Sequence, residues 1–214
     1  MSEDLPEPSG LDRAAAVMRD VRDRCVWTQQ MTHEELVPYL VEESSEVIEA
    51  VETGTRTDLR EELGDLLWQV LFHAEISARA GEFDIDDVAN DLSDKMVRRH
   101  PHVFAGETAR TPEEVLVHWN AAKAAEKRER RSVLDGIPAA MPALARAQKV
   151  LGRASSVGVG ASAPTTEPAD EAQLGEALLA LAARAREHGW DAERALRGSM
   201  RELEARVREA ETGR

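Results

Sequence analysis

Residues 40–74 read LVEESSEVIEAVETGTRTDLREELGDLLWQVLFHA, which describes two amphipathic helices joined by a short turn. At about 100° per residue, five apolar side chains of the first helix gather on one arc, as is typical of a helix that faces a core. They are Leu36, Leu40, Val47, Ala50 and Val51. Glu43 falls in the middle of this arc and Glu46 at its edge. Because burial of an unpaired carboxylate costs several kcal/mol, Glu43 needs a partner.

The second helix, predicted from about Asp58 to Ala80, carries that partner. Its apolar side chains lie on two opposite sides, so we expect it to be buried on both. One side has Leu63, Leu66, Leu67, Val70 and Ala74, and the other has Trp68 and Phe72. A narrow polar stripe, which we expect to be internal, runs between these sides through Glu62, Asp65, Gln69 and His73.

The short turn TGTRT, residues 53–57, predicts an antiparallel helix pair that places Glu43 and Glu46 opposite Glu62 and Asp65. Four carboxylates around one point repel strongly unless they are protonated or bind a metal ion. A single E-x-x-E or E-x-x-D motif is most often a surface acidic face, but two motifs within apolar stripes of adjacent helices favour a metal site. An all-oxygen set suits Mg²⁺ or Mn²⁺ rather than zinc.

A metal ion of this kind usually coordinates substrate phosphates as well, so we expect cationic side chains nearby. Lys95 and Arg99, in the segment DKMVRRHPHVF (94–104), lie on the apolar arc of their helix. Inward cations suit a polyphosphate, although a snorkelling pair at a helix end is the alternative. Trp119 and Lys123, four residues apart, offer a surface for a base and another phosphate contact. A buried Trp beside a surface Lys is the alternative there.

The remaining sequence favours an all-α fold. Helical spacing or capping signals also mark residues 11–24, FDIDD (83–87), TPEE (111–114) and about 171–211, whereas CVWTQQ (25–30) reads as a break. Aromatic residues make up only 4% of the 214 residues, and strand-like alternation is absent. The net charge of −14 argues against binding to nucleic acid or to anionic membranes. A single cysteine, with no signal peptide and no apolar run of membrane-spanning length, predicts a soluble, cytoplasmic protein.

Four segments together closely resemble the MazG family of nucleoside triphosphate pyrophosphohydrolases: EESSE (42–46), ELGD (62–65), DKMVRRHPHVF (94–104) and WNAAK (119–123). The resemblance implies an all-α helical bundle, with antiparallel helices around an acidic metal site, that works as a homodimer. It also implies Mg²⁺-dependent hydrolysis of nucleoside triphosphates and deoxynucleoside triphosphates to the monophosphate and pyrophosphate. By motif position, the metal ligands are Glu43, Glu46, Glu62 and Asp65, and the substrate contacts are Lys95, Arg99, Trp119 and Lys123.

One departure from the family is the segment Cys25-Val26-Trp27-Thr28, where the family usually shows C-P-W-D. The absence of the Pro and the Asp weakens the expectation that this segment contacts the nucleotide.

The expected mechanism is attack of a metal-activated water on the α-phosphorus, with pyrophosphate as the leaving group. Lys95 and Arg99 neutralise charge on that leaving group. Either Glu46 or Glu42 acts as the base, and the sequence leaves this choice open. The expected role is house-cleaning of the nucleotide pool. Two alternatives are a narrow-specificity pyrophosphatase for dUTP or damaged pyrimidine nucleotides, and a metal-binding regulatory module without turnover.

The chain divides into three predicted segments. Residues 1–150 form the MazG-like domain, residues 151–170 a flexible linker rich in Gly, Pro and Thr, and residues 171–214 a helical region. We interpret this last region as a degenerate second repeat, because LGEALLALAARA (174–185) aligns with LGDLLWQVLFHA (63–74). The alignment replaces two of the four carboxylate positions by Gln173 and Glu176, so we expect the region to be catalytically inert. Chance similarity between Ala/Leu/Glu-rich helices is the alternative.

Overall fold

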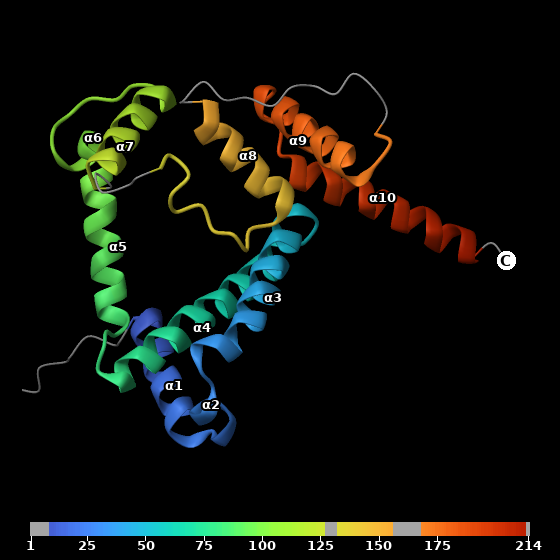
Figure 1. The fold of residues 1–214 in the computed structure, drawn as a ribbon. Helices are drawn as coiled ribbons and strands as arrows, with labels where there is room; N and C mark the ends of the chain where they lie inside the picture. Colours follow the sequence, from blue (N-terminus) through green and yellow to red (C-terminus); the bar gives the residue numbers. More distant parts are fainter. Residues whose placement is uncertain (1–8, 127–131, 156–167, 213–214) are drawn as a thin grey trace, which may run out of the picture. The chain divides into compact units, whose positions relative to one another are not determined.

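The computed structural model describes residues 9–126, 132–155 and 168–212, and all regular structure in these ranges is helical (Figure 1). The all-α prediction is therefore confirmed. The helices are α1 (Gly10–Arg24), α2 (Val26–Gln30), α3 (His33–Glu52), α4 (Arg56–Ala80), α5 (Ile85–Arg99), α6 (Pro101–Phe104), α7 (Pro112–Glu126), α8 (Ala143–Ala154), α9 (Glu171–Glu187) and α10 (Ala192–Thr212). They form two compact units, Met1–Ala125 and Glu126–Arg214.

The antiparallel pair of α3 and α4 is the central feature of the first unit (Figure 1). Thr32 caps α3 through a capping box with Glu35, as the sequence predicts. Thr55 caps α4 in the same way, so α4 begins at Arg56, two residues before the predicted start. At its other end, Gly81 adopts a left-handed conformation with φ of 74°, which suits glycine and ends the helix where the sequence predicts.

The core of the first unit lies where α1 packs against α4, beside the N-terminal part of α3. Its buried apolar residues are Met18, Met31, Leu36, Leu71 and Phe72. Arg22 is also buried, and its Nη2 donates a hydrogen bond to the Met31 carbonyl oxygen over 3.0 Å. Its guanidinium lies 5.4 Å from the centroid of the Phe72 ring, so the charge rests on an aromatic face. This contact ties α1 to the segment that precedes α3.

The predicted break at residues 25–30 is wrong, because Val26–Gln30 forms the short helix α2. The Thr28 hydroxyl explains this difference, since it donates to carbonyl oxygens of Val21 and Cys25 at 3.0 Å and fixes the turn against α1. A hydroxyl that bonds back to the preceding carbonyl groups supports a helical turn as well as a loop.

The apolar arcs of α3 and α4 are less buried than the sequence predicts. Leu36 and Ala50 are buried, but Val51 is 65% exposed and Leu63 is 50% exposed. The prediction that α4 is buried on both sides is therefore wrong for its first half. One antiparallel neighbour covers only part of a wide apolar arc, and helical spacing alone does not show where that cover ends.

The second unit consists of α8, α9 and α10, with a small core of alanine and leucine. Gln148 on α8 joins the turn between the other two helices: it donates to the Trp190 carbonyl oxygen over 2.7 Å and accepts from the Ala192 N–H over 3.2 Å. Helix α8 thus packs with α9 and α10, although the sequence placed most of it in a domain ending at residue 150. The predicted linker 151–170 begins inside α8, and its residues 156–167 lie outside the described residues.

Details of α9 favour the second-repeat interpretation, which stays a prediction. Ala180, Ala182 and Ala185 are buried, and they align with buried residues of α4. Gly189 has a left-handed φ of 69°, as Gly81 does at the end of α4. The following Asp191 accepts a hydrogen bond from the Arg194 N–H over 3.0 Å, as a helix cap does.

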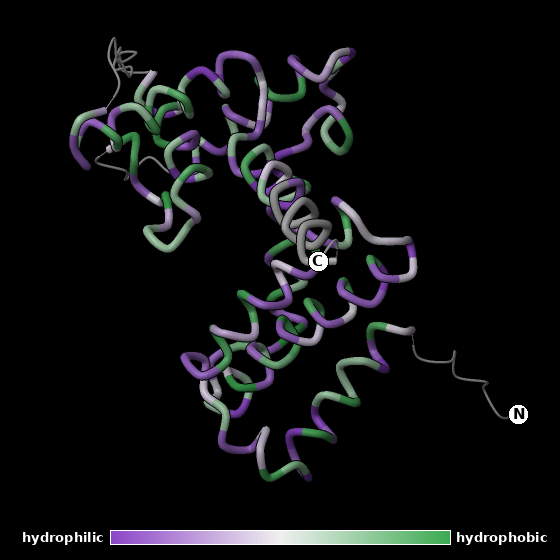
Figure 2. Tube along the Cα trace, turned by 90° about the vertical axis from the view of Figure 1, so that its right-hand side faces the viewer, coloured by the Kyte–Doolittle hydropathy of each residue, from purple (hydrophilic) through white to green (hydrophobic). Residues whose placement is uncertain are grey.

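Hydrophobic and hydrophilic residues alternate along the helices in the tube view (Figure 2). Within the described parts of the chain, every helix falls short of the length or the apolar content that crossing a bilayer requires.

Candidate metal and substrate site

Three carboxylates from the α3–α4 pair meet at one point. Glu43 on α3 and Glu62 and Asp65 on α4 each offer an oxygen atom, and these atoms lie within 4.8 Å of one another. Glu43 and Glu62 are half-buried, whereas Asp65 is exposed. The antiparallel packing predicted from the short turn brings them together, because residues after the middle of α3 face residues of the first half of α4.

The surroundings of Glu43 and Glu62 disfavour the charged forms of these two carboxylates. Burial raises the pKa of Glu43, and the neighbouring charges of Asp65, Glu46 and Glu42 raise it further. The Gln69 side chain opposes this rise, because its Nε2 donates to Glu43 Oε1 over 3.2 Å. Burial and the same kind of repulsion raise the pKa of Glu62. Crowded carboxylates with raised pKa values mark a place where a cation relieves repulsion.

Glu46 lies apart from this group, although the sequence predicts it as a fourth ligand. Its side chain is exposed, and among the described residues only Glu43, Glu62 and Asp65 have ligand atoms within mutual reach. Its charge still raises the pKa values of Glu43 and Glu62, so its carboxylate is electrostatically close. Glu42 is likewise exposed on α3.

The donor set fits a hard divalent cation. All three groups supply carboxylate oxygens, and neither a histidine nor a cysteine belongs to the cluster of described ligand atoms. Mg²⁺ and Mn²⁺ prefer such oxygen ligands and accept one or two carboxylates together with water. The cluster can therefore hold a metal ion of this class.

The four predicted substrate contacts gather elsewhere in the first unit. Arg99 is buried at the end of α5, and its guanidinium lies 5.0 Å from the centroid of the Trp119 ring on α7. Lys95 and Lys123 are half-buried on the same two helices. The sequence predicts that Lys95 and Arg99 face inward but gives no sign that Arg99 and Trp119 form a cation–π pair.

Helix α5 carries these residues away from the carboxylates. It leaves the C-terminal end of α4 and runs to α6 and α7, apart from the α3–α4 pair (Figure 1). Asp65 lies fifteen residues before Ala80, which is roughly 20 Å along the axis of α4. One chain therefore presents the carboxylates and the cations at separate places.

The polar stripe of α4 continues beyond the carboxylates into the protein. Gln69 is 5% exposed, which confirms that this part of the stripe is internal. His73 Nδ1 lies 2.7 Å from His33 Nδ1 on α3, and His33 Nε2 lies 3.3 Å from the Ser77 hydroxyl. His33 and Ser77 are not among the site residues predicted from the sequence. Spacing offered a signal for Ser77, which follows His73 by four residues on the same face.

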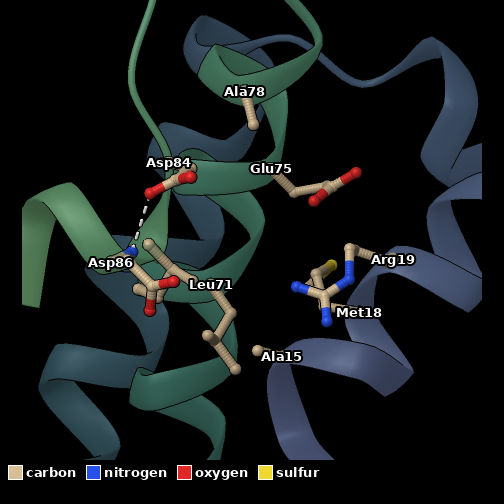
Figure 3. A pocket seen from close by; sticks show the side chains of 9 residues that line it. Ala15, Met18, Arg19, Leu71, Glu75, Ala78, Asp84 and Asp86 are labelled. Atoms are coloured by element: carbon tan, nitrogen blue, oxygen red, sulfur yellow. Dashed lines mark hydrogen bonds between the residues drawn. The ribbon is translucent and has the colours of Figure 1, made fainter. Parts of the chain in front are cut away.

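The cavity shown in Figure 3 contains none of the predicted site residues. It has a volume of about 160 Å³ and lies where α1, α4 and the start of α5 meet. Two of its acidic groups already have partners: Asp84 accepts from the Asp86 N–H over 2.9 Å as the cap of α5, and Glu75 accepts from Arg79 over 2.9 Å. The cavity is a junction between helices, apart from the three carboxylates.

The part of the sequence that carries the three carboxylates is similar to that of known proteins. Residues 31–104, which include the three carboxylates, match the family model described as MazG nucleotide pyrophosphohydrolase domain. An uncharacterized 26.1 kDa protein from Streptomyces cacaoi is 43% identical over 98% of this chain and 86% of its own length. A nucleoside triphosphate pyrophosphohydrolase of Escherichia coli (strain K12) is 36% identical over 94% of this chain and 87% of its own length.

A further relative with the same name, from Mycobacterium tuberculosis, is 48% identical over 68% of this chain but only 45% of its own length. The relatives from Streptomyces and Escherichia thus match this chain along nearly its whole length. With this length of similarity and the family match across α3–α6, the chain belongs to the MazG family of nucleotide pyrophosphohydrolases.

Proposed function

We propose that this protein hydrolyses nucleoside triphosphates and deoxynucleoside triphosphates to the monophosphate and pyrophosphate, with Mg²⁺ as its cofactor. The observation that supports this most is the meeting of Glu43, Glu62 and Asp65 at the α3–α4 pair of a MazG-family chain. Mn²⁺ has the same preference for oxygen ligands and is expected to replace Mg²⁺. Glu46 becomes the fourth ligand through a change of its side-chain rotamer, since it is exposed one turn after Glu43.

When bound at the carboxylates, the metal ion supplies positive charge for the phosphate oxygens and lowers the pKa of a water molecule. Glu46 or Glu42 accepts the proton of the attacking water, because both are exposed beside the cluster. The water oxygen bonds to the α-phosphorus, and the bond from that phosphorus to the bridging oxygen breaks. Pyrophosphate leaves with the electron pair.

Lys95, Arg99, Trp119 and Lys123 are proposed to bind the triphosphate and the base. Arg99 covers one face of the Trp119 ring, so a base stacks on the other face or displaces the guanidinium. These residues stand apart from the carboxylates of their own chain, and we propose that a second copy of the chain supplies them in a homodimer. Nucleic acid is not an expected partner, given the net charge of −14.

The proposed biological role is house-cleaning of the nucleotide pool in the cytoplasm. The single cysteine suits a reducing compartment. Broad use of nucleotides is expected from this role, because a house-cleaning enzyme meets many unwanted triphosphates.

The test is hydrolysis of a panel of ribo- and deoxynucleoside triphosphates with Mg²⁺, measured as pyrophosphate release. Glu43→Gln and Asp65→Asn are expected to abolish release while the helical circular-dichroism spectrum stays unchanged. Glu49→Gln is the matched control, because Glu49 is an exposed carboxylate on α3 outside the cluster. Turnover of dUTP alone contradicts the broad specificity, and no turnover of any nucleotide contradicts the enzymatic function.

A further inference from the structure

We propose that Ser77, His33, His73 and Gln69 form a directional hydrogen-bond relay that holds Glu43 in its metal-binding orientation. This inference rests on the proposed metal site. The four residues are positioning residues that reach the metal ion only through Glu43. The relay crosses between the two helices of the central pair, because Ser77, His73 and Gln69 lie on α4, and His33 and Glu43 lie on α3.

The histidine pair is the best-defined link of the relay. The two rings are nearly coplanar, with an angle of 4° between their planes, and their centroids are 5.0 Å apart. The 2.7 Å between the two Nδ1 atoms, plus the distance from each Nδ1 to the centre of its own ring, accounts for this separation. The rings therefore meet edge to edge through their Nδ1 atoms and do not stack face to face. This geometry gives a straight N–H···N hydrogen bond, the favoured arrangement.

One proton lies between the two Nδ1 atoms, so one ring donates and the other accepts. A pair with both rings protonated turns two N–H groups toward each other and breaks the contact. Burial, and to a lesser extent the neighbouring His33, lower the pKa of His73, which agrees with a neutral His73 ring. The titratable groups nearest to the pair in the sequence are Glu34 and Glu35 on α3 and Glu75 on α4. From α1, the buried guanidinium of Arg22 contacts Phe72, the residue before His73.

Two buried atoms between His73 and Gln69 decide in which direction the hydrogen bonds of the relay run. Within the described residues, Gln69 Oε1 and His73 Nε2 are both buried and lack a hydrogen-bond partner. They lie one helical turn apart on α4, at a spacing that brings side chains into contact. Gln69 Oε1 is an acceptor, so the partner that satisfies both atoms directly is an Nε2–H on His73. Side-chain rotation of Gln69 or His73 brings the two atoms into this direct hydrogen bond.

With the proton on His73 Nε2, every other link has only one direction. His73 Nδ1 becomes an acceptor and receives the Nδ1–H of His33 over 2.7 Å. His33 Nε2 is then also an acceptor, and it receives the Ser77 hydroxyl proton over 3.3 Å. At the other end, Gln69 Nε2–H donates to Glu43 Oε1 over 3.2 Å. All four links donate toward the Glu43 carboxylate, and each bond in such a chain polarises the next.

The consequence concerns the charge and the orientation of Glu43. The hydrogen bond from Gln69 Nε2 stabilises the negative charge on Glu43 Oε1 and fixes the orientation of the carboxylate. One oxygen is engaged by Gln69, which leaves the other for the metal ion. Groups that orient a metal ligand typically change metal affinity by 10–100-fold when they are removed. A relay that only ties α3 to α4 predicts no such change.

The first test is calorimetric titration of the full chain with Mn²⁺ alone. Gln69→Met removes the donor to Glu43 and is expected to weaken Mn²⁺ binding by about 10–100-fold. His33→Leu is expected to weaken it by a few-fold, and His33→Asn, which keeps a donor near the Nδ1 position, is expected to restore it. Leu71→Ala is the matched control, because it destabilises the same helix at a buried core position and leaves the relay intact.

Failure of the relay and failure of the metal site give different results. Wild-type Mn²⁺ affinity in Gln69→Met, together with loss of binding in Glu43→Gln, overturns the relay alone. Wild-type affinity in Glu43→Gln overturns both. Equal loss of affinity in Leu71→Ala and Gln69→Met shows that only helix packing matters, which also overturns the relay.

The second test reads the tautomers by ¹⁵N NMR of histidine-labelled protein. We expect the Nε2–H form for His73 and the less common Nδ1–H form for His33. The reverse assignment overturns the proposed direction, whatever the affinities are. Gln69→Met retains the histidine pair and shows whether the His73 tautomer depends on Gln69.

Discussion

Replacement of Glu43 by Gln is expected to change thermal stability in opposite directions with and without Mg²⁺. In the metal-free protein, a Glu43 oxygen lies within 4.8 Å of the oxygens of Glu62 and Asp65. Two unit charges separated by 4.8 Å repel by about 1 kcal/mol at the dielectric constant of water, and more at lower values. Gln retains an oxygen that accepts the bond from Gln69, so the substitution removes mainly this repulsion.

The expected gain for metal-free Glu43→Gln is therefore about 1 kcal/mol from the pair with Asp65, or roughly 4 °C in the unfolding midpoint. Mg²⁺ acts in the other direction. At a concentration of about 100 times Kd it adds about 2.7 kcal/mol to the free energy of unfolding of the wild type, or roughly 10 °C. The variant lacks one carboxylate ligand of the metal ion, so Mg²⁺ is expected to raise its free energy of unfolding much less. The two proteins thus exchange their order of stability when Mg²⁺ is added.

Differential scanning calorimetry in EDTA and in Mg²⁺ measures this exchange, and pH gives an internal check. The folded state raises the pKa values of Glu43 and Glu62 above their unfolded values, so it binds more protons than the unfolded state between those values. The stability of the metal-free wild type therefore falls as pH rises through this window, and the advantage of Glu43→Gln grows. A variant that is less stable than the wild type in EDTA, with an unchanged Mg²⁺ shift, refutes the reasoning.

Three further outcomes are expected. Lys95→Ala and Arg99→Ala should raise KM for triphosphates. Arg98→Ala, at an exposed neighbouring position, is the control. If either variant unfolds and its folded fraction keeps the wild-type KM, the residue has a structural role instead. Phe72→Ala, at a site 1% exposed, should lower the free energy of unfolding by about 3–5 kcal/mol in urea denaturation, and a loss below 1 kcal/mol contradicts the assigned core. A chain that ends at Ala125, the end of the first compact unit, should keep Mg²⁺-dependent pyrophosphate release, whereas its complete loss in a folded dimer assigns the second unit to the site.

Local signals made the helices and the carboxylates predictable. Thr32 begins α3 and Gly81 ends α4. The hydrogen bonds that cap these helices involve only neighbouring residues, so the positions of both caps follow from the sequence. Glu43, Glu62 and Asp65 meet because a three-residue turn leaves two antiparallel helices little freedom in register.

Other features depend on how helices cross, which periodicity does not determine. A helical wheel gives the direction of Glu46 to within tens of degrees, which is too coarse to predict that its side chain lies outside the cluster of three carboxylates. Lys95 and Arg99 face inward on α5, but the angle at which α5 leaves α4 depends on packing between distant residues. The contact of His33 with His73 joins positions forty residues apart, so no local pattern contains it.

The identity of the products tests the central claim most directly. Full-length protein is incubated with ATP and Mg²⁺ in water enriched in ¹⁸O, and the products are followed by ³¹P NMR. We expect AMP and pyrophosphate, with the ¹⁸O label in AMP, because the water oxygen bonds to the α-phosphorus. Formation of ADP and inorganic phosphate, or label in pyrophosphate, would contradict the account.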